Sequence, residues 1–195
     1  MATLTARGFG QARHRNGGEP VVNEYGIASG ETIYPGDPVT IDSNGLVARI
    51  STITGAGAEP IRGIAAEYVA QGTPRFSVGL LNTDAEDKIR IYDDLENTVF
   101  RVVATDTGTI SEAEVLGSRT AYSWAYGTAS TTLKQSRAYV DLNVAENETL
   151  IGFVPLRRFD GPGANEYLDS SNTIELIVKV FTATDLLART AGTPA

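Results

Sequence analysis

Acidic side chains crowd one part of the chain and are the first candidates for chemistry. Two carboxylates suffice for glycoside hydrolysis, and clustered carboxylate oxygens can bind calcium. The spacing here does not match the Asp-x-Asp-x-Asp-Gly loop of a dedicated calcium site. We expect solvated turns at strand ends, with weak cation binding and a catalytic pair as the alternatives. The acids concerned are Asp84, Glu86, Asp87, Asp93, Asp94 and Glu96.

The other reactive residue types are scarce. The chain has no cysteine and a single histidine, His14, so thiolate metal sites, cysteine nucleophiles and disulfides cannot form. An HExxH zinc site cannot be written, and a Ser-His-Asp triad would have to use His14. Residues 55–60 resemble a dinucleotide-binding loop only faintly, because Pro60 replaces the third glycine. We therefore predict that the protein is not an enzyme and binds no cofactor and no metal.

Three aromatic residues form a second candidate site. Tyr122, Trp124 and Tyr126 are spaced by two, which on a strand would place them on one face. We expect a buried core stripe or a subunit interface, because aromatic residues dominate both settings. The alternative is an exposed stacking platform, as in a carbohydrate- or receptor-binding β module.

Charge divides the chain into a basic segment and an acidic body. Residues 1–18 hold three arginines and no acid, which leaves 13 basic and 24 acidic side chains on the rest. The segment lacks periodicity and ends in two glycines, so we predict an extended arm that becomes ordered on an acidic protein partner. Nucleic-acid binding and an inert tail are the alternatives, and three arginines are too few for strong nucleic-acid binding. The candidate partner-binding residues are Arg7, Phe9, Arg13, His14 and Arg15.

A second pair of arginines, Arg157 and Arg158, follows an apolar run that contains Pro155. Proline within a strand favours a sheet edge or a bulge. Two arginines on a strand edge could pair with carboxylates of a neighbouring subunit, which makes them a candidate subunit interface, but solvent exposure is the default interpretation.

The segments that must position these residues are predicted to be strands. The chain of 195 residues is 42% apolar, which is enough for a substantial core. Short apolar runs alternate with Gly, Pro and Asn turns, and only residues 111–117 look helical, with capping-box spacing. We predict an all-β protein with a sandwich or barrel-like body and very little helix. Its parts are an arm at 1–18, a small β lobe at 19–72, a main domain at 73–183 and a flexible tail at 184–195.

The predicted strands cover residues 32–34, 39–41, 46–50, 61–69, 75–81, 88–92, 98–104, 136–142, 150–159 and 173–181. Asn44-Gly45 predicts a tight hairpin between two of them. In the last strand, Ile174, Leu176, Val178 and Val180 share one apolar face, which predicts a core strand. No run of about 18 apolar residues and no signal-peptide pattern occurs, so we expect folding in the cytoplasm and no membrane partner.

Several segments resemble small structural proteins of tailed bacteriophages. Residues 91–102 read Ile-Tyr-Asp-Asp-Leu-Glu-Asn-Thr-Val-Phe-Arg-Val and are similar to a Tyr-Asp-Asp-Pro segment of that family, with Leu95 in place of the proline. Residues 34–39, Tyr-Pro-Gly-Asp-Pro-Val, resemble the Gly-Asp-x-Val turn of head-decoration proteins. The order of later segments, ending in Val178-Lys179-Val180, is also similar.

The resemblance implies a capsid decoration, or cement, protein. Such a protein is a β-rich subunit, expected as a homotrimer, that sits on the capsid exterior of the virion and clamps neighbouring subunits of the major capsid protein. Many weak clamps on one shell would add up through avidity. The implied partners are the major capsid protein and further copies of this chain.

Overall fold

The computed structural model describes residues 8–51, 59–67, 69–70, 88–108, 110, 120–127, 135–145, 152–159 and 173–182. This part of the chain contains thirteen strands and no helix, so the all-β prediction is confirmed. Three predicted features lie outside the described residues. They are the helix at 111–117, the strand at 75–81 and the tail at 184–195.

The larger sheet closes into a barrel. Its strand order is β1 (Gly10–His14), β9 (Thr98–Thr105), β11 (Ala138–Ala145), β10 (Tyr122–Tyr126), β12 (Phe153–Arg158) and β13 (Thr173–Val180). A further pairing between β9 and β13 joins the ends of a five-stranded ring, with β1 added outside it. Closure removes most open sheet edges.

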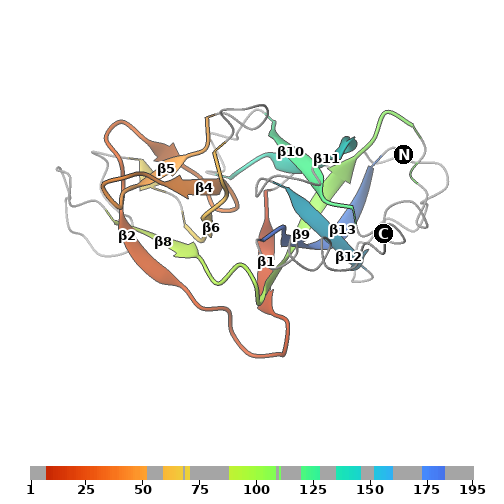
Figure 1. The fold of residues 1–195 in the computed structure, drawn as a ribbon, viewed down its shortest axis with the longest axis horizontal. Helices are drawn as coiled ribbons and strands as arrows, with labels where there is room; N and C mark the ends of the chain where they lie inside the picture. The colour runs from red at the N-terminus through yellow and green to blue at the C-terminus, as the bar shows by residue number, and fades with distance from the viewer. Residues whose placement is uncertain are drawn as a thin grey trace, which may run out of the picture.

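The second sheet has five strands in the order β2 (Asn23–Gly26), β8 (Lys88–Tyr92), β6 (Gly63–Ala65), β4 (Pro38–Ile41) and β5 (Val47–Arg49). A parallel bridge between Ile27 and Val47 connects its two edges. A short pair, β3 (Thr32–Ile33) and β7 (Val69–Ala70), accompanies it. Figure 1 shows this small sheet at one end of the long axis and the barrel at the other, with β1 drawn between them.

The predicted hairpin is present between β4 and β5. Val39 pairs with Arg49, Thr40 with Ala48 and Ile41 with Val47. Gly45 has a φ of 77°, a conformation that glycine adopts without strain. The Asn-Gly dipeptide was therefore a correct turn signal.

Sheet membership crosses the division predicted at residue 73. The strand β8 was assigned to the main domain, but it pairs with β2 and β6 in the small sheet. Ile89 and Ile91 alternate with exposed side chains along β8 and fill the core of that sheet. The bend at 93–97 then carries the chain into β9 of the barrel. The lobe therefore needs a strand that is distant in sequence.

The described residues form three apolar clusters, the smallest of which consists of Ala121, Val154 and Phe181. The small-sheet core contains Ile27, Ile33, Val39, Val47, Ala65, Ile89 and Ile91. The barrel core includes the predicted face of β13, all four residues of which are buried, so that prediction is confirmed. The same cluster also takes in Ile50, Ile61 and Ile64 from the small-sheet region. The small-sheet region thus has a core of its own and also contributes side chains to the barrel core.

Part of the predicted arm belongs to the barrel. Residues 10–14 are extended, but as strand β1, which pairs antiparallel with β9. Phe9 is only 2% exposed and stacks on Phe153, with ring centres 4.0 Å apart. The expectation that Phe9 is an exposed anchor for a partner is therefore wrong, because its ring fills the core of its own chain.

Candidate functional site

Asp37 lies at the centre of a polar contact between the two sheets. It follows the turn at Gly36 and has no exposed surface. Its Oδ2 accepts a hydrogen bond from the Tyr34 N–H at 3.1 Å and lies 3.2 Å from the Arg49 Nε. Burial raises the pKa of Asp37, whereas the Ser136 hydroxyl and the Arg49 guanidinium oppose that rise. The carboxylate is thus held inside the molecule by groups from both sheets.

Arg49 connects Asp37 to the barrel through Tyr126. The guanidinium carbon lies 3.6 Å from the centre of the Tyr126 ring, which is cation–π geometry. The Tyr126 hydroxyl donates a hydrogen bond to the Pro38 carbonyl at 2.8 Å. Burial raises the pKa of Tyr126 far above its ordinary value, so the hydroxyl stays protonated and remains a donor. We name Asp37, Arg49 and Tyr126 the junction.

A close crossing of main chains supports the junction. The Phe9 N–H donates to the Gly36 carbonyl at 3.0 Å, and both Gly8 and Gly36 have positive φ. A Cβ on Gly36 would lie 2.7 Å from the Phe9 nitrogen, and one on Gly8 would lie 2.5 Å from the Ser136 Cβ. Only glycine fits at these two positions. The lead-in to β1 is therefore clamped between the two sheets.

The junction is suited to holding the sheets together. Asp37 has no exposed surface and Trp124 is 2% exposed, so neither side chain can reach a substrate in solution. A buried ion pair with hydrogen bonds is costly to break by removal of one partner. The contacts of Asp37, Arg49 and Tyr126 can therefore hold the two sheets together.

The aromatic stripe is part of the core. Trp124 packs its ring edge-on against Tyr126, with centres 4.7 Å apart, and Tyr122 is half-buried against the same cluster. The core interpretation is thus confirmed, whereas the subunit-interface and stacking-platform interpretations of Trp124 are wrong. Residues with a spacing of two share a face of a strand, and in β10 that face packs against the barrel core.

The basic residues predicted to bind partners are distributed over several elements. Arg13 in β1 and Arg15 just after it are exposed, and His14 is half-buried, 3.9 Å from Asp94 Oδ2. Arg157 is exposed and Arg158 half-buried on β12, next to a register shift at Pro155. The bulge predicted from that proline is present. Arg7 lies outside the described residues.

The acidic bend fixes the crossing between the sheets. The Asn23 amide donates to both oxygens of Asp93, and the Tyr25 hydroxyl donates to Oδ2. Asp94 accepts from the Asn97 amide at 3.0 Å, and Glu96 is half-buried. Among the described residues, no group of three His, Cys, Asp or Glu side chains could hold a metal. Asp84, Glu86 and Asp87 lie outside them.

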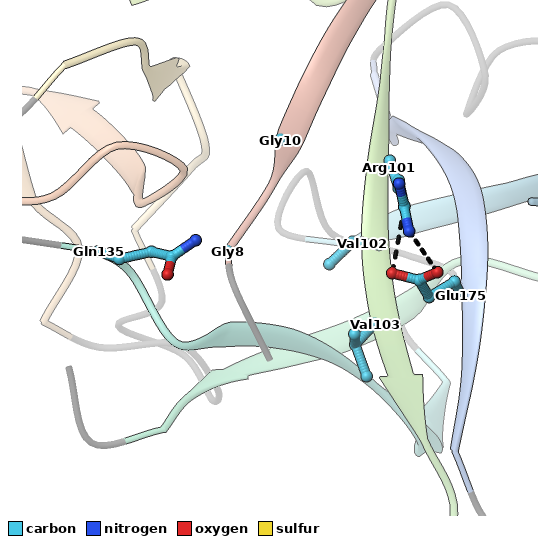
Figure 2. Close-up of a pocket in the computed structure, with 7 residues that line it drawn as sticks. All are labelled: Gly8, Gly10, Arg101, Val102, Val103, Gln135 and Glu175. Atoms are coloured by element: carbon cyan, nitrogen blue, oxygen red, sulfur yellow. Dashed lines mark hydrogen bonds and ion pairs between the residues drawn. The ribbon is translucent and has the colours of Figure 1, made fainter. Parts of the chain in front are cut away.

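A small cavity opens beside β9, a feature that sequence reasoning missed. On one edge of β9, pairing with β1 ends at Arg101 and pairing with β11 begins at Ala104. A cavity of about 220 Å³ lies at this interruption, which we name the β9 notch. Figure 2 shows its lining, Gly8, Gly10, Arg101, Val102, Val103, Gln135 and Glu175. No local pattern marks it, because it arises where two distant strands meet a third.

One wall of the β9 notch is a rigid ion pair. Arg101 binds Glu175 through two hydrogen bonds, Nε to Oε1 at 3.1 Å and Nη2 to Oε2 at 2.5 Å. The guanidinium also stacks on Phe159, 3.7 Å from the ring centre. Paired charges make this wall electrically neutral and fix its shape.

Comparison with known proteins adds no relative. No protein-family model, curated protein or solved structure matches the chain. In the described residues, no helix has the length and apolar character needed to cross a membrane. What the protein does is therefore inferred from its own residues.

Proposed function

We propose that this chain is a structural capsid decoration protein of a tailed bacteriophage. It binds the exterior of an assembled head, as a homotrimer, and holds neighbouring subunits of the major capsid protein together. It is synthesised in the host cytoplasm and works without catalysis, cofactor, nucleic acid or membrane. The sequence resemblance of residues 30–182 supports this role, and one structural observation carries it further.

That observation is the rigid connection between the two sheets. A clamp resists the separation of its targets only if its own parts do not move apart. The junction links the small sheet to the barrel by an ion pair, a cation–π contact and a hydrogen bond. The shared apolar cluster adds a non-polar connection across the same boundary. Both features suit a protein that carries load between two neighbours.

The contact with the shell is assigned to Arg13 and Arg15. Both side chains are exposed, and β1 attaches them to the barrel. Arginine pairs with carboxylates through a planar fork of donors, which suits an acidic protein surface. The arginines are therefore presented by a fixed strand and its end, and this replaces the free arm predicted from sequence.

A double charge reversal tests this assignment. We expect Arg13→Glu/Arg15→Glu to lower occupancy on purified heads that lack the protein by about tenfold or more, because both charge contacts become repulsive. Arg62→Glu is the matched control, since Arg62 is exposed next to β6 of the small sheet. Truncation of residues 1–18 is unsuitable, because it removes Phe9 and β1 from the fold.

Occupancy is measured by quantitative gel analysis of sedimented heads. Equal binding of the double variant and wild type would overturn the role of the two arginines. Failure of the wild-type protein to bind heads of the phage that encodes it would overturn the proposed function itself. The carbohydrate-binding alternative has lost its main support, because Trp124 is in the core.

A further inference from the structure

The chain contains two Asn-Gly dipeptides in exposed turns, Asn16-Gly17 and Asn44-Gly45. We propose that Asn16 is a site of spontaneous deamidation, that Asn44 is protected from it, and that the new carboxylate at position 16 weakens attachment to the shell. The modification itself rests on the geometry of the two turns. Only its effect on attachment rests on the proposed function.

Deamidation at an Asn-Gly pair needs water but no enzyme. The main-chain nitrogen of the glycine attacks the side-chain carbonyl carbon of the asparagine and gives up its proton. The new carbon–nitrogen bond closes a succinimide ring, the bond to the amide nitrogen breaks, and that nitrogen leaves with the proton as ammonia. Water then opens the ring at either carbonyl, which leaves aspartate or isoaspartate. Glycine favours the first step because it has no side chain to shield its nitrogen.

The Asn16 side chain is available for this reaction. Its amide has no hydrogen-bond partner among the described residues, and a Cβ placed on Gly17 would meet nothing within 4 Å. The Asn16 N–H donates to the His14 Nδ1 at 3.3 Å, and the Gly17 N–H donates to the His14 carbonyl at 3.1 Å. The Gly17 bond must open before its nitrogen can attack. It is a single hydrogen bond in an exposed turn, so opening it costs little.

The chain that follows this turn restrains it weakly. Residues 18–22 connect β1 to β2 and make no main-chain hydrogen bonds with the described part of the chain. Figure 1 shows this connection at the lower edge of the view, outside both sheets. Few hydrogen bonds and high exposure are the marks of a segment that opens locally. The turn can therefore change shape without disturbing a strand.

The turn at Asn44 has the same dipeptide in a more restrained setting. Asp42 Oδ1 accepts from the Asn44 N–H at 2.8 Å and from the Leu46 N–H at 2.9 Å, and Oδ2 accepts from the Asn44 side-chain amide at 3.4 Å. These bonds from Leu46 and Asn44 lower the pKa of Asp42, so it stays an ionised acceptor. The Gly45 N–H donates to the Asp42 carbonyl at 3.1 Å, within the hairpin of β4 and β5. Asn44 must release both its side chain and its main chain before it can react.

The two settings predict different rates of deamidation. Each hydrogen bond that must open lowers the population of the reactive conformer, and two additional bonds at Asn44 correspond to a reaction about tenfold slower than at Asn16. Peptide mapping by mass spectrometry measures both rates in one sample. The protein is stored at neutral pH in water enriched in heavy oxygen, so that ring opening labels the product. Label should enter position 16 about tenfold faster than position 44.

Two further measurements identify the fold as the cause. Asp42→Ala removes the side-chain bonds that hold Asn44 and leaves Asn16 as it is, so it should raise the rate at position 44 alone. In urea sufficient to unfold the chain, the two rates should converge. Equal rates in the folded protein would overturn the inference. A tenfold difference that persists in urea would also overturn it, because neighbouring residues in the sequence would then be the cause.

The product places a negative charge directly after Arg15, which the proposed function assigns to the shell contact. We expect Asn16→Asp to lower occupancy on purified heads about two- to fivefold, the size of one exposed charge interaction. Asn44→Asp is the matched control, because it adds the same charge to an exposed turn of the small sheet. Normal occupancy of Asn16→Asp would overturn the effect on attachment and leave the modification site standing. Absence of wild-type binding would overturn the proposed function together with that effect, whereas the rates at the two asparagines test the modification separately.

Discussion

Asp37 shows how a single buried charge can organise two sheets. A carboxylate without exposed surface loses its hydration, which raises its pKa. This rise in pKa is opposed by Arg49 on β5, by Ser136 before β11 and by the Tyr34 N–H, all of which stabilise the carboxylate. Arg49 in turn faces Tyr126, and its own N–H donates to Glu31. The acid is therefore a connection point whose partners come from the hairpin and the barrel.

The raised pKa of Asp37 predicts a pH dependence. A carboxyl whose folded pKa exceeds its unfolded value takes up a proton more readily when folded, so its contribution to stability is fully present below the unfolded pKa. That contribution is lost as pH rises through the folded pKa. We expect the unfolding free energy of wild type minus that of Asp37→Asn to increase as the pH falls from about 7 to about 4.

Urea unfolding of both proteins at several pH values measures this difference. Other carboxylates titrate in both proteins and cancel in the comparison. A difference that stays constant, or that shrinks toward acid, would show that the pKa of Asp37 is not raised in the folded state.

At the scale of elements, β1 depends on a glycine crossing. The segment Gly10–His14 has no apolar alternation of its own, and β9 supplies its pairing. Gly36 lies against the main chain of Phe9, and a side chain at position 36 would collide with it. The turn before β4 and the start of β1 can therefore come this close only because position 36 is glycine. The position of β1 is therefore set by a contact between strands that belong to different sheets.

Two glycine substitutions separate backbone strain from this contact. Gly45→Ala adds strain from positive φ alone, about 1 to 2 kcal/mol, because a Cβ there meets nothing within 4 Å. Gly36→Ala adds the same strain and a clash with Phe9, so we expect a loss of about 3 kcal/mol or more. Denaturant unfolding of the two variants provides the comparison. Equal losses would mean that the crossing contributes nothing.

At the scale of the whole molecule, the two sheets share a core. Ile64 lies in β6 of the small sheet, yet it is fully buried in the same cluster as Phe100 and Trp124 of the barrel. The sheets also exchange chain segments, because β8 joins the small sheet and β1 joins the barrel. Neither sheet is complete with the residues of one continuous stretch.

This arrangement predicts cooperative unfolding. We expect scanning calorimetry to show one transition, since each sheet would lose apolar cover if the other unfolded. Ile64→Ala should lower the stability of the whole molecule by about 2 to 5 kcal/mol and keep a single transition. Exposed Leu156, on β12, provides the control Leu156→Ala. Two separate transitions in wild type would refute the shared core.

Local patterns were sufficient for many of the strands. Alternation identified β8, β9 and the buried face of β13, and Asn44-Gly45 identified the hairpin. These signals depend on neighbours two to four residues apart, which the chain displays directly. The same reasoning missed β1 and β2, because Gly10–His14 and Asn23–Gly26 contain few apolar residues and are held mainly by pairing.

The absence of cysteine, the scarcity of histidine and the all-β class were readable from the amino-acid sequence by itself, because they depend on composition and on short-range periodicity. Only the tertiary structure decided that Phe9 and Trp124 face inward and that β8 completes the small sheet. Strand pairing joins residues far apart in the chain, so sequence spacing carries little information about which edges meet. The junction of Asp37, Arg49 and Tyr126 arises at such a meeting.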